Sequence, residues 1–192
     1  MITGYRESVF AKVSIDSRNI SEKDLFVAIE GDRHDGHVFV RDVAASGVRG
    51  AVVSMRKANL FNREEYDSRR FVLVGVEDTT KALGDLALYN RNRAGVSVVA
   101  ATGSNGKTTT RKMTAAVIRR RFSAFSSKGN FNNEIGLPLS LLGLGHEHQW
   151  AVVELGANHP GEISYLARIC RPDIAIVTNV GPAHLEGFGS LE

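Results

Sequence analysis

The residues best suited to chemistry form one short run: Thr102, Gly103, Ser104, Asn105, Gly106, Lys107, Thr108 and Thr109. Glycines let backbone N–H groups approach an anion closely, and the N-terminus of a following helix attracts negative charge. Lys107 can reach outer phosphates, and the Thr108 hydroxyl can bind Mg²⁺. Ala101 stands where the general P-loop pattern has its first glycine. We favour a loop that binds ATP or a related nucleotide over a glycine-rich turn without a ligand, because Gly-Lys-Thr-Thr lies at a strand-to-helix junction.

Two further polar side chains follow later apolar stretches. Glu154 ends the expected strand Ala151–Glu154, and His184 comes shortly after the expected strand Ile174–Thr178. Ligands of open α/β sheets collect beyond the carboxyl ends of the strands, so both side chains would point toward the phosphates if these strands are neighbours. A carboxylate suits Mg²⁺, and we favour Glu154 as a ligand over a strand-terminal residue in water. Imidazole is not a preferred Mg²⁺ ligand, so spacing alone leaves His184 as either a ligand or a solvated histidine.

Another unusual stretch, from Lys128 to Pro138, is rich in asparagine and glycine. One interpretation is a turn whose asparagine caps the helix that follows. The other is a cluster of neutral amides that holds a carboxylate or a phosphate without adding charge. Spacing does not decide between these two interpretations.

The elements around these motifs alternate between strand and helix patterns, which predicts a parallel sheet built from crossover connections. The expected order is strand Val96–Ala101, the P-loop, helix Arg111–Arg120, strand Ser123–Ser126, helix Asn133–Leu142, strand Ala151–Glu154, helix Glu162–Ile169 and strand Ile174–Thr178. A doubly wound nucleotide domain carries about five or more strands. Since this pattern holds fewer, we expect an incomplete central domain.

The residues before position 95 predict a smaller α/β domain. Its expected strands are Val9–Ile15, Leu25–Ile29, Ala51–Ser54 and Phe71–Val74. A helix is expected over His37–Ser46, ending at Gly47, and the polar Arg56–Arg70 is expected to form an exposed loop or short helix. Asp78 and Thr79 are good caps for a helix that ends near Arg93. We therefore expect an N-terminal domain at 1–78, a connecting helix at 79–94 and an ATP-binding domain at 95–192.

Composition narrows the class of protein. The 192 residues are 43% apolar and 23% charged, which is ordinary for a folded domain. The net charge of +3 is too small to indicate nucleic-acid binding, and the triplet Arg119–Arg121 lies at an expected helix end, where cations complement the dipole. Cys170 is the single cysteine, which we expect to be a core residue in a reducing compartment. With no signal or membrane-spanning stretch recognised, we expect a cytoplasmic monomer without membrane insertion.

Four segments resemble the central motifs of the Mur ligases. They are Thr-Gly-Ser-Asn-Gly-Lys-Thr-Thr at 102–109, Gly-Asn-Phe-Asn-Asn-Glu-Ile-Gly-Leu-Pro at 129–138, Glu-Leu-Gly-Ala-Asn-His-Pro-Gly-Glu-Ile at 154–163 and Asn-Val-Gly-Pro-Ala-His-Leu-Glu-Gly-Phe-Gly-Ser at 179–190. Near the N-terminus, Ile15–Arg18, Asp24–Ala28 and Asp35–His37 resemble the family's uridine-nucleotide domain. The chain most resembles the member that joins D-alanyl-D-alanine to UDP-N-acetylmuramoyl (UDP-MurNAc) tripeptide in peptidoglycan synthesis.

The resemblance implies an ATP-dependent ligase that activates a carboxylate as an acyl phosphate, which an amine then attacks. It implies that Lys107 holds phosphates and that Thr108 and Glu154 hold Mg²⁺, and it assigns His184 to a second Mg²⁺. Its implied substrate contacts are Asn130, Asn133, Asn158 and His159 for the muramoyl peptide, and Ser17 and Arg18 for the uridine diphosphate. Because the family places a modified lysine and much of the adenine site after residue 192, we expect that these residues alone do not ligate.

Three alternatives remain open at this point. A different Mur-type amino-acid ligase is one, although the Asn-Phe-Asn-Asn and Ala-Asn-His-Pro-Gly-Glu segments argue against it. A non-catalytic module that binds a UDP-sugar or a nucleotide is the second. The third, a nucleic-acid-dependent NTPase, lacks support because no basic stripe or aromatic platform accompanies the loop.

Overall fold

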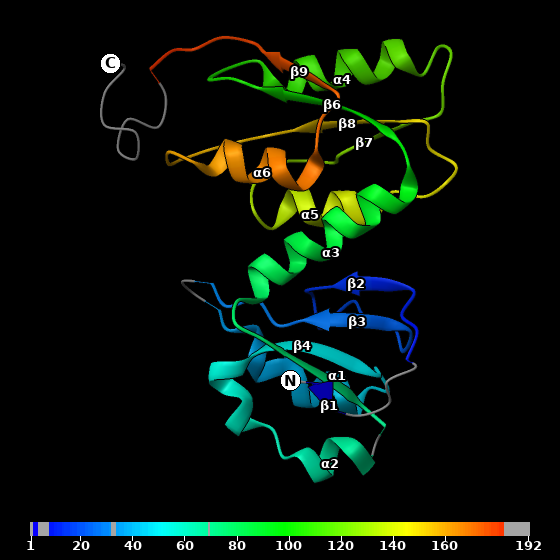
Figure 1. Ribbon diagram of the computed structural model, residues 1–192, viewed down its shortest axis with the longest axis vertical. Helices are drawn as coiled ribbons and strands as arrows, with labels where there is room; N and C mark the ends of the chain where they lie inside the picture. The colour runs from blue at the N-terminus through cyan, green and yellow to red at the C-terminus, as the bar shows by residue number, and fades with distance from the viewer. Residues whose placement is uncertain (1, 4–7, 32–33, 69, 183–192) are drawn as a thin grey trace. The chain divides into compact units, whose positions relative to one another are not determined.

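The computed structural model describes residues 2–3, 8–31, 34–68 and 70–182. The chain divides into two compact units, Met1–Leu83 and Gly84–Glu192. Each unit contains one sheet with helices (Figure 1). The α/β class expected from the sequence is confirmed.

The first unit contains a five-stranded sheet in the order β1-β5-β4-β3-β2, in which β1 alone is antiparallel to its neighbour. Its strands are β1 (Ile2–Thr3), β2 (Lys12–Ser14), β3 (Asp24–Val27), β4 (Gly50–Ser54) and β5 (Val72–Val76). Its helical segments are the 3₁₀ turns η1 (Gly36–Phe39) and η2 (Met55–Leu60) and the helices α1 (Val40–Ala45) and α2 (Arg63–Ser68). Apolar side chains of β3, β4 and β5, among them Phe26, Val53 and Leu73, pack with α1 in the core of this unit.

Two expectations for the first unit need correction, and one of its strands was not expected. Strand β1 is not predicted by the sequence pattern, and the expected strand Val9–Ile15 is reduced to β2. The expected helix over His37–Ser46 begins as a 3₁₀ turn, because Asp35 accepts a hydrogen bond from the His37 N–H at 3.0 Å and starts that tighter turn. Gly47 does take positive φ after α1, as expected of a residue that ends a helix.

The His37 side chain is buried and fully paired. Its Nδ1 lies 2.6 Å from Asp35 Oδ1, and its Nε2 accepts a hydrogen bond from the Ser54 N–H at 2.8 Å. Lys57 Nζ donates to the other Asp35 oxygen at 2.5 Å. Burial disfavours ionisation of Asp35, but the hydrogen bonds from Lys57 and His37 outweigh it and lower the pKa of this carboxyl to about 2. This network ties η1 to β4 and η2.

The second unit contains a four-stranded parallel sheet in the order β7-β8-β6-β9, which confirms the parallel arrangement expected from the sequence. Its strands are β6 (Ser97–Thr102), β7 (Ala124–Ser126), β8 (Trp150–Glu154) and β9 (Ile174–Val177). Its helices are α4 (Lys107–Ile118), α5 (Gly136–Leu142) and α6 (Glu162–Cys170), and α3 (Thr79–Ala94) enters it at Gly84. None of the helices that the structure describes has the length and apolar composition that a membrane crossing requires.

The two central strands of this sheet are buried on both faces. Helices α5 and α6 cover one face, where Val98 and Val153 lie in a core with Leu141 and Leu166. Helix α4 covers the other face and is visible above β6 in Figure 1. Cys170 lies in the first of these cores, and burial raises the pKa of its thiol to about 12. The expectation that Cys170 is a core residue is therefore confirmed.

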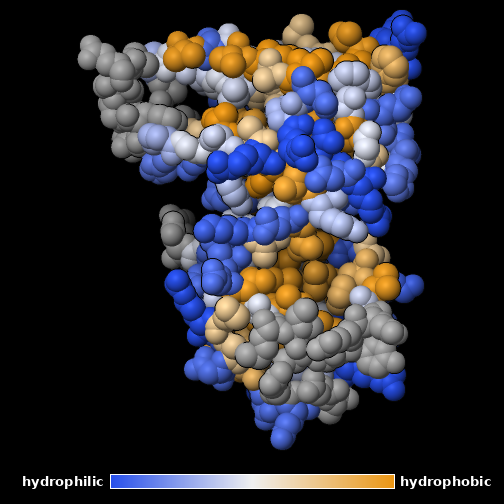
Figure 2. Space-filling view, in the orientation of Figure 1, coloured by the Kyte–Doolittle hydropathy of each residue, from blue (hydrophilic) through white to orange (hydrophobic). Residues whose placement is uncertain are grey.

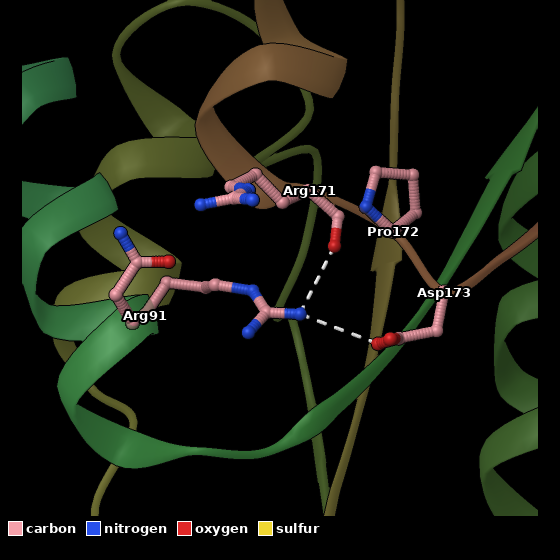
Figure 3. A pocket seen from close by; sticks show the side chains of 5 residues that line it. Arg91, Arg171, Pro172 and Asp173 are labelled. Carbon is pink, nitrogen blue, oxygen red and sulfur yellow. Dashed lines mark hydrogen bonds and ion pairs between the residues drawn. The ribbon is translucent and has the colours of Figure 1, made fainter.

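Arg91 of α3 holds the C-terminal end of α6 (Figure 3). It donates to Cys170 O at 2.9 Å, to Arg171 O at 3.0 Å and to Asp173 Oδ2 at 3.2 Å. The last carbonyl groups of a helix have no partner within the helix, so these bonds satisfy them from outside. The pocket in Figure 3 therefore consists of polar groups that largely pair with one another.

Strand β9 lies at one edge of the sheet and is only partly covered. Figure 2 shows apolar side chains over β9 and α4, and those of Met113, Val117, Ile174 and Val177 are exposed. Helix α4 contacts β6, β7 and β8 more extensively than it contacts β9. Helix α4 therefore leaves much of β9 uncovered.

Candidate functional site

The loop between β6 and α4 has a backbone shape that requires glycine. Gly103 and Gly106 have φ values of +130° and +79°. A Cβ on Gly103 would lie 2.8 Å from Asn179 O, which is closer than side chains approach a backbone. Gly106 is the N-cap residue that precedes α4 and offers no side chain to cap it, so the first N–H groups of the helix remain available to an anion. Helix α4 starts at Lys107, earlier than the expected Arg111, because the left-handed Gly106 turns the chain directly into it.

The chain after β9 holds the P-loop from the side, and we call residues 178–181 the strap. Thr178 Oγ1 donates to Asn105 O at 2.6 Å. Ser104 Oγ lies 2.9 Å from both the carbonyl oxygen and the N–H of Gly181. The shape of the loop is therefore set by contacts with residues far along the sequence.

Lys107 contacts the loop that precedes it. Its Nζ donates to Gly103 O at 2.7 Å and to Ser104 O at 3.3 Å. The side chain is half-buried at the N-terminus of α4. A positive charge and uncapped helix N–H groups thus lie together, which is the arrangement that phosphates bind.

Glu154 lies at the end of β8, next to the first turn of α4. It is 4% exposed, and both of its carboxylate oxygens accept hydrogen bonds. The Thr108 hydroxyl donates to Oε2 at 2.8 Å, and Asn132 Nδ2 donates to Oε1 at 2.9 Å. Arg111 Nε lies 3.6 Å from Oε2. The expected proximity of Glu154 and Thr108 is confirmed, because β6 and β8 are neighbours in the sheet.

This cluster includes two residues that the sequence does not single out. Arg111 is expected only as the start of a helix, although its position three residues after Thr108 puts both on one helix face. Asn132 lies between Asn130 and Asn133, which the family resemblance indicates instead. Arg111 could have been recognised as a site residue because it is a basic residue one turn into the helix after the P-loop. No spacing rule distinguishes Asn132 from the neighbouring asparagines.

The remaining residues expected at the substrate differ from this cluster in exposure and in their partners. Asn130 is exposed, and the Asn133 side chain accepts from the Gly136 N–H at 2.8 Å. This bond fits the interpretation of Asn133 as a turn residue that satisfies N–H groups at the start of the helix, although the N-cap position of α5 is Ile135 and the helix begins at Gly136, not at Asn133 as expected. Asn158 and His159 are exposed, and both of their N–H groups bind one oxygen of Glu162, at 2.6 and 3.2 Å.

The expected uridine contacts Ser17 and Arg18 belong to the first unit. Arg18 forms a two-point ion pair with Asp16, with its Nε and Nη2 donating at 2.8 and 3.0 Å. This side-chain hydrogen bonding lowers the pKa of Asp16 and raises that of Arg18. His184, the remaining expected site residue, lies outside the described residues.

The residues around Glu154 fit a magnesium ion. Thr108 donates its hydrogen to Glu154, so the lone pairs of its oxygen remain available to a cation. Mg²⁺ prefers oxygen ligands and is held by one or two carboxylates together with the phosphates of a substrate. Among the residues that the structure describes, no group of three His, Cys, Asp or Glu side chains could hold a metal.

Two family models match the chain, one in each half of the sequence. The model described as the Mur ligase family, catalytic domain, matches residues 9–91, and the Mur ligase middle domain matches residues 101–192. The chain belongs to the Mur ligase family.

Curated relatives of this Mur ligase are named UDP-N-acetylmuramoyl-tripeptide–D-alanyl-D-alanine ligase. The Haemophilus influenzae relative is 39% identical over 184 residues, which are 94% of this chain and 38% of the relative. The Escherichia coli relative is 42% identical over 179 residues, 93% of this chain and 37% of the relative. The chain therefore spans well under half the length of these relatives.

Solved Mur ligase structures agree with the fold. MurF from Acinetobacter baumannii matches with a TM-score of 0.84 and 41% identity, over 93% of this chain and 38% of that one. MurF ligase from Thermotoga maritima in complex with ADP matches with a TM-score of 0.83 and 33% identity, over 97% of this chain and 42% of that one. The second neighbour was solved with ADP bound.

Proposed function

We propose that this chain is the nucleotide-binding part of an ATP-dependent ligase that joins D-alanyl-D-alanine to UDP-MurNAc-tripeptide in peptidoglycan synthesis. The observation that carries the proposal is the hydrogen bond from the P-loop Thr108 to the buried Glu154 of the next strand. It unites the two groups that a magnesium nucleotide needs, in a chain whose relatives are named for this ligation. The proposal includes a monomer located in the cytoplasm, where ATP is available.

The P-loop would hold the phosphates of ATP. Lys107 would exchange the carbonyl oxygens of Gly103 and Ser104 for phosphate oxygens, which carry more negative charge. The N-terminal N–H groups of α4 would bind the same anion. The residues assigned to the nucleotide are Thr102, Gly103, Ser104, Asn105, Gly106, Lys107, Thr108 and Thr109.

Thr108 and Glu154 would hold Mg²⁺, which neutralises phosphate charge during phosphoryl transfer. We assign His184 to a second Mg²⁺ by family resemblance alone. Two cations would serve a reaction in which two anions, a carboxylate and a triphosphate, must approach each other.

The muramoyl peptide would lie near Asn130, Asn133, Asn158 and His159. The last two are exposed and belong to the loop after β8, so they are accessible to a large ligand. Ser17 and Arg18 would contact the uridine diphosphate. Because Arg18 already binds Asp16 at two points, a diphosphate would compete with that carboxylate for it.

In the proposed reaction, the terminal carboxylate of the peptide accepts the γ-phosphoryl group of ATP, and ADP leaves. The amine of D-alanyl-D-alanine then attacks the acyl phosphate carbon, and inorganic phosphate departs as the amide bond forms. The contribution of the protein is positioning and charge neutralisation, since phosphoryl transfer needs little covalent help.

Calorimetry on the 192-residue chain tests the proposal. We expect the chain to bind ADP more tightly in the presence of Mg²⁺ than in its absence. In Glu154→Gln, the increase in affinity that Mg²⁺ produces should be about tenfold smaller than in the parent. Glu147→Gln, which removes an exposed carboxylate, is the matched control and should bind like the parent. UDP-MurNAc-tripeptide should bind better than UDP-MurNAc-dipeptide. A chain that binds neither nucleotide nor UDP-MurNAc-tripeptide would contradict the proposal, and preference for the dipeptide would indicate another Mur-type ligase.

A further inference from the structure

The charged side chain of Arg111 is buried, although a position in a helix does not by itself require burial. Arginine is rarely buried without a partner, yet Arg111 is 4% exposed and faces the sheet from the middle of α4. Its nearest acid is Glu154, which is equally buried. Among the residues that the structure describes, Arg111 supplies the ion pair of Glu154, because Lys107 binds loop carbonyl groups instead.

The guanidinium group is anchored on its other side. Nη1 donates to Ser126 Oγ at 3.0 Å and also to Ser127 O, at the end of β7. A guanidinium is a rigid plane, so fixing Nη1 fixes the direction of Nε as well. Arg111 therefore connects the end of β7 with the carboxylate at the end of β8.

The Nε atom is buried and has no hydrogen-bond partner within the described part of the chain. It lies 3.6 Å from Glu154 Oε2, which is too long for a hydrogen bond and short enough for an ion pair. Oε2 already accepts the hydrogen bond from Thr108. A buried donor without a partner is a cost that proteins avoid, so its retention beside this carboxylate needs an explanation.

We propose that Arg111 is a positioning residue, which holds the Glu154 carboxylate beside Thr108 so that a divalent cation meets ligands already in place. The inference rests on the proposed function, since it takes Glu154 as the ligand. Arg111 itself touches neither cation nor nucleotide in this account. Groups that orient a metal ligand commonly change metal affinity by about 10- to 100-fold when they are removed.

Cation affinity, measured separately from nucleotide affinity, tests the inference. Mn²⁺ replaces Mg²⁺, and the affinity of the protein for the cation is obtained from the decrease in the EPR signal of free Mn²⁺ when protein is added to a fixed mixture of Mn²⁺ and ADP, compared with the same mixture without protein. We expect Arg111→Met to weaken Mn²⁺ binding about tenfold, with ADP affinity in EDTA unchanged. Lys112→Met, which removes an exposed charge from the same helix, should leave both affinities unchanged.

Two further variants keep the inference testable if Arg111→Met does not fold. Arg111→Lys keeps the charge but cannot hold Ser126 and Glu154 with one rigid plane, so its loss of Mn²⁺ affinity should be intermediate. Ser126→Ala removes one anchor and should weaken Mn²⁺ binding in the same direction. Circular dichroism of each variant checks that it is folded.

The outcomes separate this inference from the proposed function. A parent chain that binds no Mn²⁺ with ADP contradicts the proposed function and this inference together. A parent that binds Mn²⁺ while Arg111→Met binds it as well or better overturns the inference alone. Full recovery in Arg111→Lys would also overturn it, because charge without orientation would then suffice.

Discussion

Replacing Gly103 by alanine tests whether the P-loop shape depends on its glycine. Gly103 has φ +130°, where side chains are strained, and a Cβ there would lie 2.8 Å from Asn179 O and 3.0 Å from Asn179 N. It would also collide with Thr178 Oγ1. Thr178 can rotate away, but the Asn179 backbone cannot do so without moving the strap. The substitution must therefore distort either the loop or the strap.

The expected loss of stability is the sum of the backbone strain at Gly103 and the steric overlap of the added Cβ. Strained backbone costs about 1–3 kcal/mol and overpacking adds about 1–3 kcal/mol, so we expect Gly103→Ala to lose about 3 kcal/mol of stability. For a chain of this length that corresponds to a decrease in Tm of roughly 6 to 12 °C. Gly95→Ala is the matched control. Gly95 has φ +66°, but a Cβ there would meet no described atom within 4 Å, so only backbone strain of about 1 kcal/mol applies.

Thermal unfolding followed by circular dichroism, together with ADP titration, measures both variants. Gly103→Ala should unfold at a lower temperature than Gly95→Ala and should bind ADP less tightly than the parent. If instead the loop absorbs the methyl group by shifting, the stability loss becomes smaller and the loss of ADP affinity larger. Two variants with equal Tm and parental ADP affinity would refute the steric reasoning.

Three other expectations concern pairing and packing. Because the pKa of Asp35 is lowered to about 2 from 3.8, its ionised form stabilises the fold above about pH 4, and this contribution disappears as the pH falls toward 2. In urea unfolding at several pH values, the free energy of unfolding of Asp35→Asn should depend on pH by roughly 1–2 kcal/mol less than that of the parent, after allowance for solvent screening. Parallel pH profiles of the two proteins would contradict this role of Asp35. The buried Cys170 thiol should react with a disulfide reagent at about pH 8 only after unfolding, and fast labelling of the native chain would show that it is accessible. Leu166→Ala should cost about 3 kcal/mol, against less than about 0.5 kcal/mol for the exposed Val117→Ala, as measured by denaturant unfolding.

Local signals predicted the elements whose ends depend on neighbouring residues. Helix α3 begins at Thr79, as expected, because Asp78 Oδ1 accepts hydrogen bonds from the N–H groups of Thr80 and Lys81. The parallel sheet also followed from the alternation of apolar strand and helix patterns. The expected meeting of Thr108 and Glu154 needed one further assumption, that their strands are neighbours.

What the sequence did not predict depends on contacts between distant residues. Of the three asparagines, it is Asn132 that binds Glu154. The chain at Gly156 passes so close to the Asn132 side chain that a Cβ on Gly156 would lie 2.9 Å from it. No local pattern encodes that approach. The burial of Arg111 likewise depends on β7 and β8, which lie later in the chain.

The strap has a consequence for how the protein is synthesised. It binds the P-loop across 73 to 77 residues of sequence. A ribosome therefore releases the loop and α4 well before the residues that hold the loop in shape. Contacts of such sequence separation form late in folding. On the proposed function, the nucleotide site of a nascent chain would form only after β9 has joined β6. ATP would then stabilise the sheet that contains both strands and would not assist the intermediates that precede it.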